Sequence, residues 1–156
     1  MRIMKTGLSA AACAVLLTLG ATASAAEPED AIHYRQSAFG VIGWHFSPIA
    51  DMAKGDVEYD ADEFARRAQN VADLASMPWE GFVDGTYQND GHGINTDALA
   101  KIADNPDDFQ QKQQDMMDEA QKLAKIAQEK DFRTSRAQLS KVGKTCKNCH
   151  DDYRAE

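Results

Sequence analysis

Four stretches of the chain carry apolar residues at every third or fourth position, a pattern typical of helices with one buried face. The first helix is predicted over residues 28–55, because a proline and two acidic residues favour a helix start at its beginning. Pro48 lies inside this range and cannot donate a backbone hydrogen bond, so we expect a kink or a short break there. Ser47 could then cap the second piece of the helix.

The second helix is expected to follow Asp60 as its cap and to end at Met77, because the residue before Pro78 resists helical backbone angles. The Gly-rich stretch 79–95 lacks helical periodicity and is the best candidate for a loop that covers a site. The third helix should begin within residues 105–108, where a capping asparagine precedes a proline and two acidic residues.

Asp131 is positioned to cap the fourth helix. In the last three helices the residues expected to face inward are Phe64, Ala68, Val71, Leu74, Ala75, Phe109, Met116, Ala120, Leu123, Ala127, Phe132, Ser135, Leu139, Val142, Cys146, Cys149 and Tyr153. Four helices of roughly twenty residues with short connections predict an all-α, antiparallel up-down-up-down four-helix bundle. Cofactors in such bundles sit in the core between facing helices.

The N-terminal residues 1–25 are predicted to be a cleaved signal peptide. Arg2 and Lys5 form a basic start, an apolar stretch follows, and Ala23 and Ala25 fit the small-residue cleavage pattern. A retained membrane anchor would need about twenty apolar residues, which is more than this stretch supplies. The mature domain is therefore expected to span residues 26–156, to lie in the periplasm and to have no membrane segment.

Composition narrows the possible functions of this domain. The chain is 43% apolar and 27% charged, which suits one globular domain. Its formal charge is -8, and removing the two basic residues of the signal peptide leaves 15 basic against 25 acidic residues, or -10. Such a chain has no basic surplus to displace counterions from phosphates, so non-specific nucleic-acid binding is excluded.

The C-terminal sequence Cys146-Lys147-Asn148-Cys149-His150 is C-x-x-C-H, the pattern of covalent c-type haem attachment. Two cysteines three residues apart lie on one side of a helix, where each thiol can form a thioether, while the adjacent imidazole can bind iron. In a thioredoxin-like redox pair, the motif would lie near the start of a helix that follows a strand. A zinc site would need further ligands, and the remaining histidines are scattered.

The chain resembles the cytochrome c′ family, the class II c-type cytochromes, over nearly the whole mature sequence. The segments that carry the resemblance are Pro28–Ala31, Tyr34–Ala38, Met77–Trp79, Gly85-Thr86, Phe109–Gln114 and Cys146–Arg154. The resemblance implies one haem c held by Cys146 and Cys149, with His150 as the proximal iron ligand. It also implies a homodimer that pairs through the first two helices.

Further roles follow from the same resemblance. Arg35 and Gln36 are expected to contact the haem propionates, and Arg154 to reach the proximal face. Asp90 is expected at the haem edge. The residues expected to wall the pocket are Trp79 and Phe82.

The resemblance places Phe39 on the distal side, facing the iron from the first helix. Phenylalanine has no lone pair to donate, so a five-coordinate, high-spin iron that binds NO or CO is expected. Transfer of single electrons to a redox partner that the sequence does not identify is a second expected role. The alternatives are a low-spin electron carrier with a sixth ligand, a peroxidase and a helical binding module without haem. A peroxidase would need a distal His-Arg pair, and no catalytic residues are expected.

Overall fold

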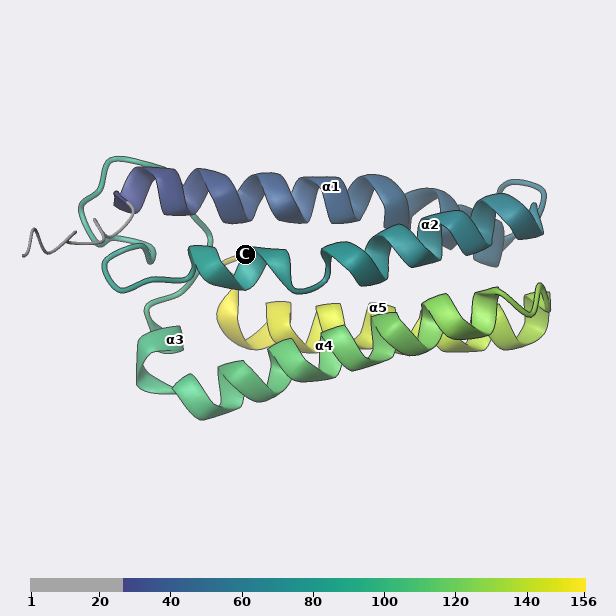
Figure 1. Cartoon of the computed structure of the whole chain (residues 1–156). Coiled ribbons are helices and arrows are strands. Elements are labelled where there is room, and N and C mark those ends of the chain that lie inside the picture. The colour runs from purple at the N-terminus through teal and green to yellow at the C-terminus, as the bar shows by residue number, and fades with distance from the viewer. Residues whose placement is uncertain (1–26) are drawn as a thin grey trace, which may run out of the picture.

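The structure is a computed structural model of the protein, and it describes residues 27–156. The elements are α1 (Pro28–Lys54), α2 (Ala61–Leu74), the 3-10 helix η1 (Met77–Gly81), α3 (Lys101–Asp104), α4 (Pro106–Ala127) and α5 (Phe132–Tyr153). The four long helices run lengthwise beside one another and alternate in direction (Figure 1). The expected antiparallel four-helix bundle is confirmed. The predicted signal peptide lies outside the described residues.

Helix α1 continues through Pro48 without interruption. Proline has no backbone N–H, so the carbonyl of Trp44, one turn earlier, lacks its usual helical donor. Nη1 of Arg67 on α2 donates a hydrogen bond to that carbonyl at 3.0 Å. The expected short break with Ser47 as a new cap is therefore wrong, because a neighbouring helix supplies the missing donor.

Helix α2 begins as predicted but ends earlier. The carboxylate of Asp60 accepts hydrogen bonds from the backbone N–H groups of Asp62 and Glu63, both at 3.0 Å, and so caps the helix. The helix ends at Leu74 rather than at Met77. Met77 and Pro78 instead begin η1, which takes up the first three residues of the stretch predicted as a loop.

The cap predictions for the last two helices had different outcomes. The side-chain amide of Asn105 donates to the carbonyl of Lys101 at 2.9 Å and does not cap α4. That prediction is wrong, because the short helix α3 ends at Asp104, directly before Asn105, and offers the Asn105 side chain the carbonyl of Lys101. The carboxylate of Asp131 accepts from the backbone N–H of Thr134 at 2.7 Å and caps α5, as expected.

The core lies between the helix pairs α1–α2 and α4–α5. Most residues predicted to face inward are buried, and Leu74, Cys146 and Cys149 are half-buried. Phe132 is the exception at 36% exposure, because it lies at the first position of α5. α4 packs along α5 and α2, and α2 packs along α1, but α1 and α5 make few direct contacts. A space is thereby left between α1 and α5.

Candidate functional site

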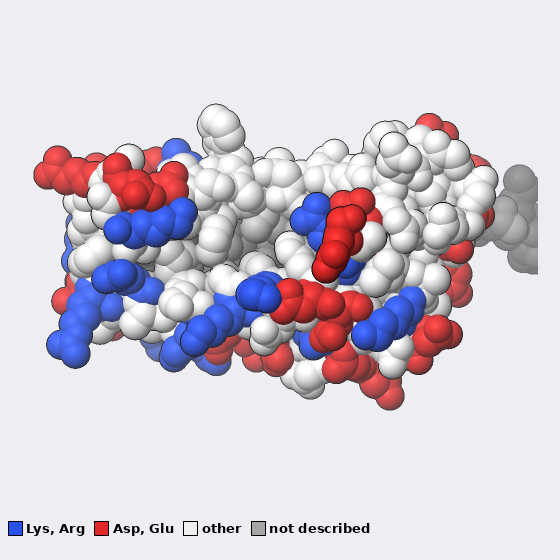
Figure 2. Space-filling model, turned by 180° about the vertical axis from the view of Figure 1, so that it is seen from behind, with Lys and Arg blue, Asp and Glu red and all other residues white. Residues whose placement is uncertain are grey.

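A cavity of about 580 Å³ occupies this space between α1 and α5. Figure 2 shows it as a hollow in the middle of one face of the molecule, with mostly uncharged side chains directly around it. Its lining is mostly apolar, with a few polar groups at the end where η1, the segment 96–98 and the end of α5 meet. This volume and lining are typical of a site for a small organic ligand or cofactor.

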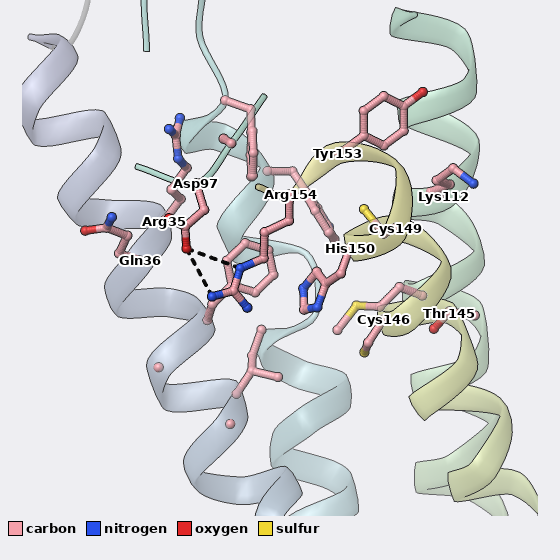
Figure 3. A pocket seen from close by; sticks show the side chains of 18 of the residues that line it. Arg35, Gln36, Asp97, Lys112, Thr145, Cys146, Cys149, His150, Tyr153 and Arg154 are labelled. Carbon is pink, nitrogen blue, oxygen red and sulfur yellow. Dashed lines mark hydrogen bonds and ion pairs between the residues drawn. The ribbon is translucent and has the colours of Figure 1, made fainter. Parts of the chain in front are cut away.

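Helix α5 contributes Cys146, Cys149 and His150 to the cavity wall. Both cysteines are half-buried, and neither forms a disulfide within residues 27–156. Burial raises the pKa of both thiols, that of Cys149 to about 11. The imidazole of His150 projects from α5 toward α1 (Figure 3). Burial and the nearby Arg154 guanidinium lower the pKa of His150, which favours the neutral imidazole that binds metals.

Helix α1 forms the opposite wall with Phe39, Gly40 and Gly43. The Phe39 ring makes edge-on contacts with the rings of Trp79 and Phe82, at centroid distances of 5.5 and 6.3 Å. A Cβ atom added at either glycine would meet nothing within 4 Å. This wall is therefore flat along the glycines and bulky at Phe39.

Arg35 of α1 lies at the polar end of the cavity and connects the residues there to the first helix. It is 2% exposed, and its Nη1 donates to the carbonyl of Gly81 and to the Thr86 hydroxyl, both at 2.7 Å. Its Nη2 donates to the carbonyl of Thr86 and to the hydroxyl of Thr96. The guanidinium also lies 4.7 Å from the centre of the Phe82 ring. This single side chain therefore ties η1 and the following loop to the first helix.

η1 approaches α1 so closely that residue 81 has to be glycine. A Cβ atom at Gly81 would lie 2.6 Å from the carbonyl oxygen of Ala31 and 2.8 Å from Cβ of Arg35. Gln36, one position farther along α1, donates its side-chain amide to the carbonyl of Asn95 at 2.9 Å. Both contacts hold the loop over the cavity.

The end of α5 is tied to the segment before α3. Nη2 and Nε of Arg154 donate to the Asp97 carboxylate at 3.0 and 3.3 Å, across the cavity mouth in Figure 3. The backbone N–H of Leu99 donates to the carbonyl of Tyr153, and that of Ala155 to the carbonyl of Asp97. Arg154 thus lines the cavity beside His150. Asp97 was not singled out from the sequence, because an isolated acidic residue in a loop carries no pattern.

Most predicted site residues line this one cavity, and Asp90 does not. Its carboxylate accepts from the backbone N–H of Tyr87 at 2.8 Å within a turn of the loop. Met116 and Lys112 of α4 also line the cavity and were not singled out as site residues. The inward spacing on α4 does identify Met116 as a core position.

Comparison with known proteins agrees with this arrangement. The family model described as Cytochrome C' matches residues 30–154 of the chain. The chain belongs to the cytochrome c′ family. Cytochrome c′ from Halomonas halodenitrificans is 55% identical over 132 residues, which cover 84% of this chain and all of that protein. A cytochrome c′ structure from Shewanella frigidimarina matches with a TM-score of 0.79 and 40% identity, over 85% of this chain and all of that one.

As a cytochrome c′, the protein carries covalently bound haem c. Three features of the cavity fit this group. The space is apolar, two thiols and an imidazole line it from one helix, and Arg35 brings a buried positive charge to one end. Within residues 27–156, no carboxylate lies within 4.0 Å of the Arg35 guanidinium. The buried Trp79 Nε1 also has no hydrogen-bond acceptor. Anionic propionate groups complement both.

Proposed function

We propose that this cytochrome c′ is a periplasmic, high-spin protein that binds NO or CO and passes single electrons. In this proposal Cys146 and Cys149 hold the haem through thioethers and His150 is its proximal iron ligand. The bound iron supplies one open coordination position for a diatomic gas. The other residues of the cavity orient the group, exclude water and restrict access to that position.

The observation that carries the proposal is the wall that faces His150 across the cavity. Phe39 contributes a phenyl ring there, and its edge-on contacts with Trp79 and Phe82 hold that ring in place. A phenyl group has no lone pair, so it cannot be a sixth ligand. It also offers no hydrogen bond to a bound gas, which favours NO and CO because they need none.

We assign the polar groups at the cavity mouth to two roles in holding the haem. We propose that Arg35, Gln36 and Trp79 position the haem propionates, Arg35 mainly through its charge because its four Nη hydrogens already have acceptors. Arg154, held by Asp97, lies on the proximal side beside His150. Asp90 is given no role in contacting the haem, since its carboxylate closes a turn of the loop.

A structural relative supports gas binding. The structure described as a nitric oxide complex of the L16I mutant of cytochrome c prime from Alcaligenes xylosoxidans matches with a TM-score of 0.75 and 35% identity. The match covers 85% of this chain and all of that one. At that identity, the same chemistry is a reasonable expectation for the present chain.

The main rival is a low-spin electron carrier, and one residue favours it. Met116 lines the cavity from α4, and its thioether could serve as a sixth ligand. Its side chain, however, is 4% exposed and packs among the buried residues Ile42, Val71, Ala72 and Ala75. Met52 of α1, the other buried methionine of residues 27–156, does not line the cavity.

Absorption spectra of the purified, haem-loaded protein distinguish the two functions. A broad, high-spin spectrum of the reduced protein that shifts on addition of CO or NO is expected. Sharp low-spin bands that do not respond to CO would contradict gas binding and favour electron transfer with a sixth ligand.

We also propose that the protein is not an enzyme. Among the described residues that line the cavity, His150 is the only histidine, and the Nη groups of Arg35 are engaged by neutral acceptors. His45 lies outside the lining, 3.4 Å from the side-chain nitrogen of Asn70. A distal His-Arg pair for cleavage of a peroxide is therefore not formed by these residues.

The periplasmic location rests on the predicted signal peptide. Each helix in the described part of the chain is too short or too polar to span a bilayer.

We propose a homodimer that pairs through α1 and α2, because Tyr34, Val41 and Trp44 form an exposed apolar stripe on α1. Trp44 is 72% exposed. Trp44→Glu is expected to yield monomers in sedimentation velocity, whereas Val83→Glu, on the loop, should leave the dimer intact.

Truncation of the distal wall is expected to speed gas binding. In Phe39→Ala the phenyl group no longer blocks the approach to the iron, so the CO association rate should rise by roughly tenfold, a barrier change of about 1.4 kcal/mol. Stopped-flow mixing of the reduced protein with CO measures the rate. Phe39→Leu, which keeps an apolar side chain of similar length, should change it less. An unchanged rate in Phe39→Ala would show that Phe39 does not restrict access.

A further inference from the structure

Helix α5 differs in charge from every other long helix of this acidic protein. Between Phe132 and His150 it carries five Lys or Arg residues and no Asp or Glu. Each of the three other long helices, α1, α2 and α4, has more acidic than basic residues. The basic residues of α5 are Arg133, Arg136, Lys141, Lys144 and Lys147, here called the α5 basic face.

All five side chains of the α5 basic face are exposed. At 100° per residue they fall within an arc of about 140° on the helix surface. Lys147 pairs with Asp151 of the same helix. For the other four, no carboxylate of residues 27–156 lies within 4.0 Å. The face thus concentrates positive charge that intramolecular ion pairs leave largely free.

The α5 basic face adjoins the haem cavity. Lys144 and Lys147 flank Thr145 and Cys146, which both line the cavity. Figure 2 shows Lys and Arg side chains along the lower side of the hollow on that face of the molecule. A partner held on this face would therefore lie beside the helix to which the haem is attached.

We propose that the α5 basic face docks an acidic electron-transfer protein, so that one electron passes between that protein's redox group and the haem. The inference rests on the proposed function, since it requires a redox-active haem. In the reducing direction one electron leaves the partner's redox group and ferric iron becomes ferrous, with no bond made or broken. The net negative charge of the chain repels an acidic partner elsewhere, so this face sets the orientation of docking.

A protein partner fits this face better than an anionic membrane. Helices that bind membrane surfaces insert Trp, Phe or Leu side chains into the lipid. Among the exposed large apolar side chains of residues 27–156, only Phe132 lies on α5, and its exposure is 36%. A charged, weakly apolar surface instead suits a short-lived complex between redox proteins.

The test uses a reduced bacterial flavodoxin, a small acidic electron carrier, as the probe. Stopped-flow measurements follow reduction of the ferric, haem-loaded protein over a range of salt concentrations. For the unaltered protein the second-order rate constant should fall as salt rises, although both proteins are acidic overall. In Lys141→Glu/Lys144→Glu the rate constant at low salt should fall roughly tenfold, and the difference should vanish at high salt.

A matched control is Lys54→Glu/Lys125→Glu, which makes the same change in net charge with two exposed lysines of α1 and α4. Its rate constant should change less than twofold, because neither lysine belongs to the α5 basic face. Equal slowing of both variants, or a rate constant that rises with salt in the unaltered protein, would overturn the proposal. Carbodiimide cross-linking to the same flavodoxin gives a readout independent of electron transfer. Links should form at Lys141, Lys144 or Lys147, and links at other lysines alone would contradict it.

Two further measurements separate this inference from its alternatives. Binding to vesicles of pure phosphatidylglycerol that is lost in Lys141→Glu/Lys144→Glu, without cross-links to flavodoxin on α5, would assign the face to lipid and overturn the proposal. Absorption spectra of every variant are recorded first. If these spectra are low-spin, gas binding fails, but salt-dependent reduction through α5 would still support docking.

Discussion

A variant with alanine at both Cys146 and Cys149 is expected to lose all covalently held haem. The two thiols line the cavity from one side of α5, and the proposed thioethers are the only covalent links between the chain and the group. His150 alone would bind haem reversibly. Extraction of the denatured protein with acidified acetone should therefore leave the pigment with the unaltered chain and remove it from the double variant.

The control for this experiment is Thr145→Ala, which alters a neighbouring residue of the cavity wall that has no thiol. This variant should retain its haem through extraction. Each single cysteine variant should also retain part of it, because one thioether remains. Pigment that stays with the chain in the Cys146→Ala/Cys149→Ala variant would refute the assignment of these two residues.

Arg35→Ala is expected to cause the largest loss of stability among the single substitutions considered. Removal of the guanidinium leaves the carbonyls of Gly81 and Thr86 and the Thr86 hydroxyl without this donor in a buried site, while the Thr96 hydroxyl keeps only the N–H of Ala98. Buried polar groups that lose a partner cost about 1–3 kcal/mol each, partly offset by relaxation of the loop. The free energy of unfolding should fall by about 3 kcal/mol in urea titrations of the haem-loaded protein.

Arg35→Lys separates charge from hydrogen bonding. Lysine keeps the positive charge but lacks the planar fork that reaches acceptors on both η1 and the loop. It should therefore recover only part of the lost stability. Lys125→Ala on the exposed surface of α4 should change the free energy of unfolding by about 0.5 kcal/mol or less. A change that small in Arg35→Ala would show that the loop does not depend on Arg35.

The four long helices could be predicted because their signals are local. Apolar residues recur along each one with the period of the helix, and Asp60 and Asp131 cap helices through N–H groups two or three residues away. The C-x-x-C-H motif is local too, since five consecutive residues of α5 bring both thiols and the imidazole to one cavity. Neighbouring residues and helical geometry suffice for these features.

The wrong predictions share a different cause. A proline inside a helix predicts a break at Pro48 unless another donor reaches the freed carbonyl, and Arg67 of α2 is that donor. A capping role for Asn105 follows from its position before a proline, but α3 offers its side chain another acceptor. In each case a contact with a different element outweighs the local preference.

By itself, the sequence of this cytochrome c′ determined its four helices, the polarity of their faces and the C-x-x-C-H motif that predicts where haem is attached. Only the tertiary structure decided how the cavity is closed. Arg35 reaches acceptors 46 to 61 residues away, and Arg154 pairs with Asp97 at a separation of 57 residues. Periodicity and motif spacing act over a few turns of helix. Contacts across such separations depend on how the helices pack and where the loop between them runs.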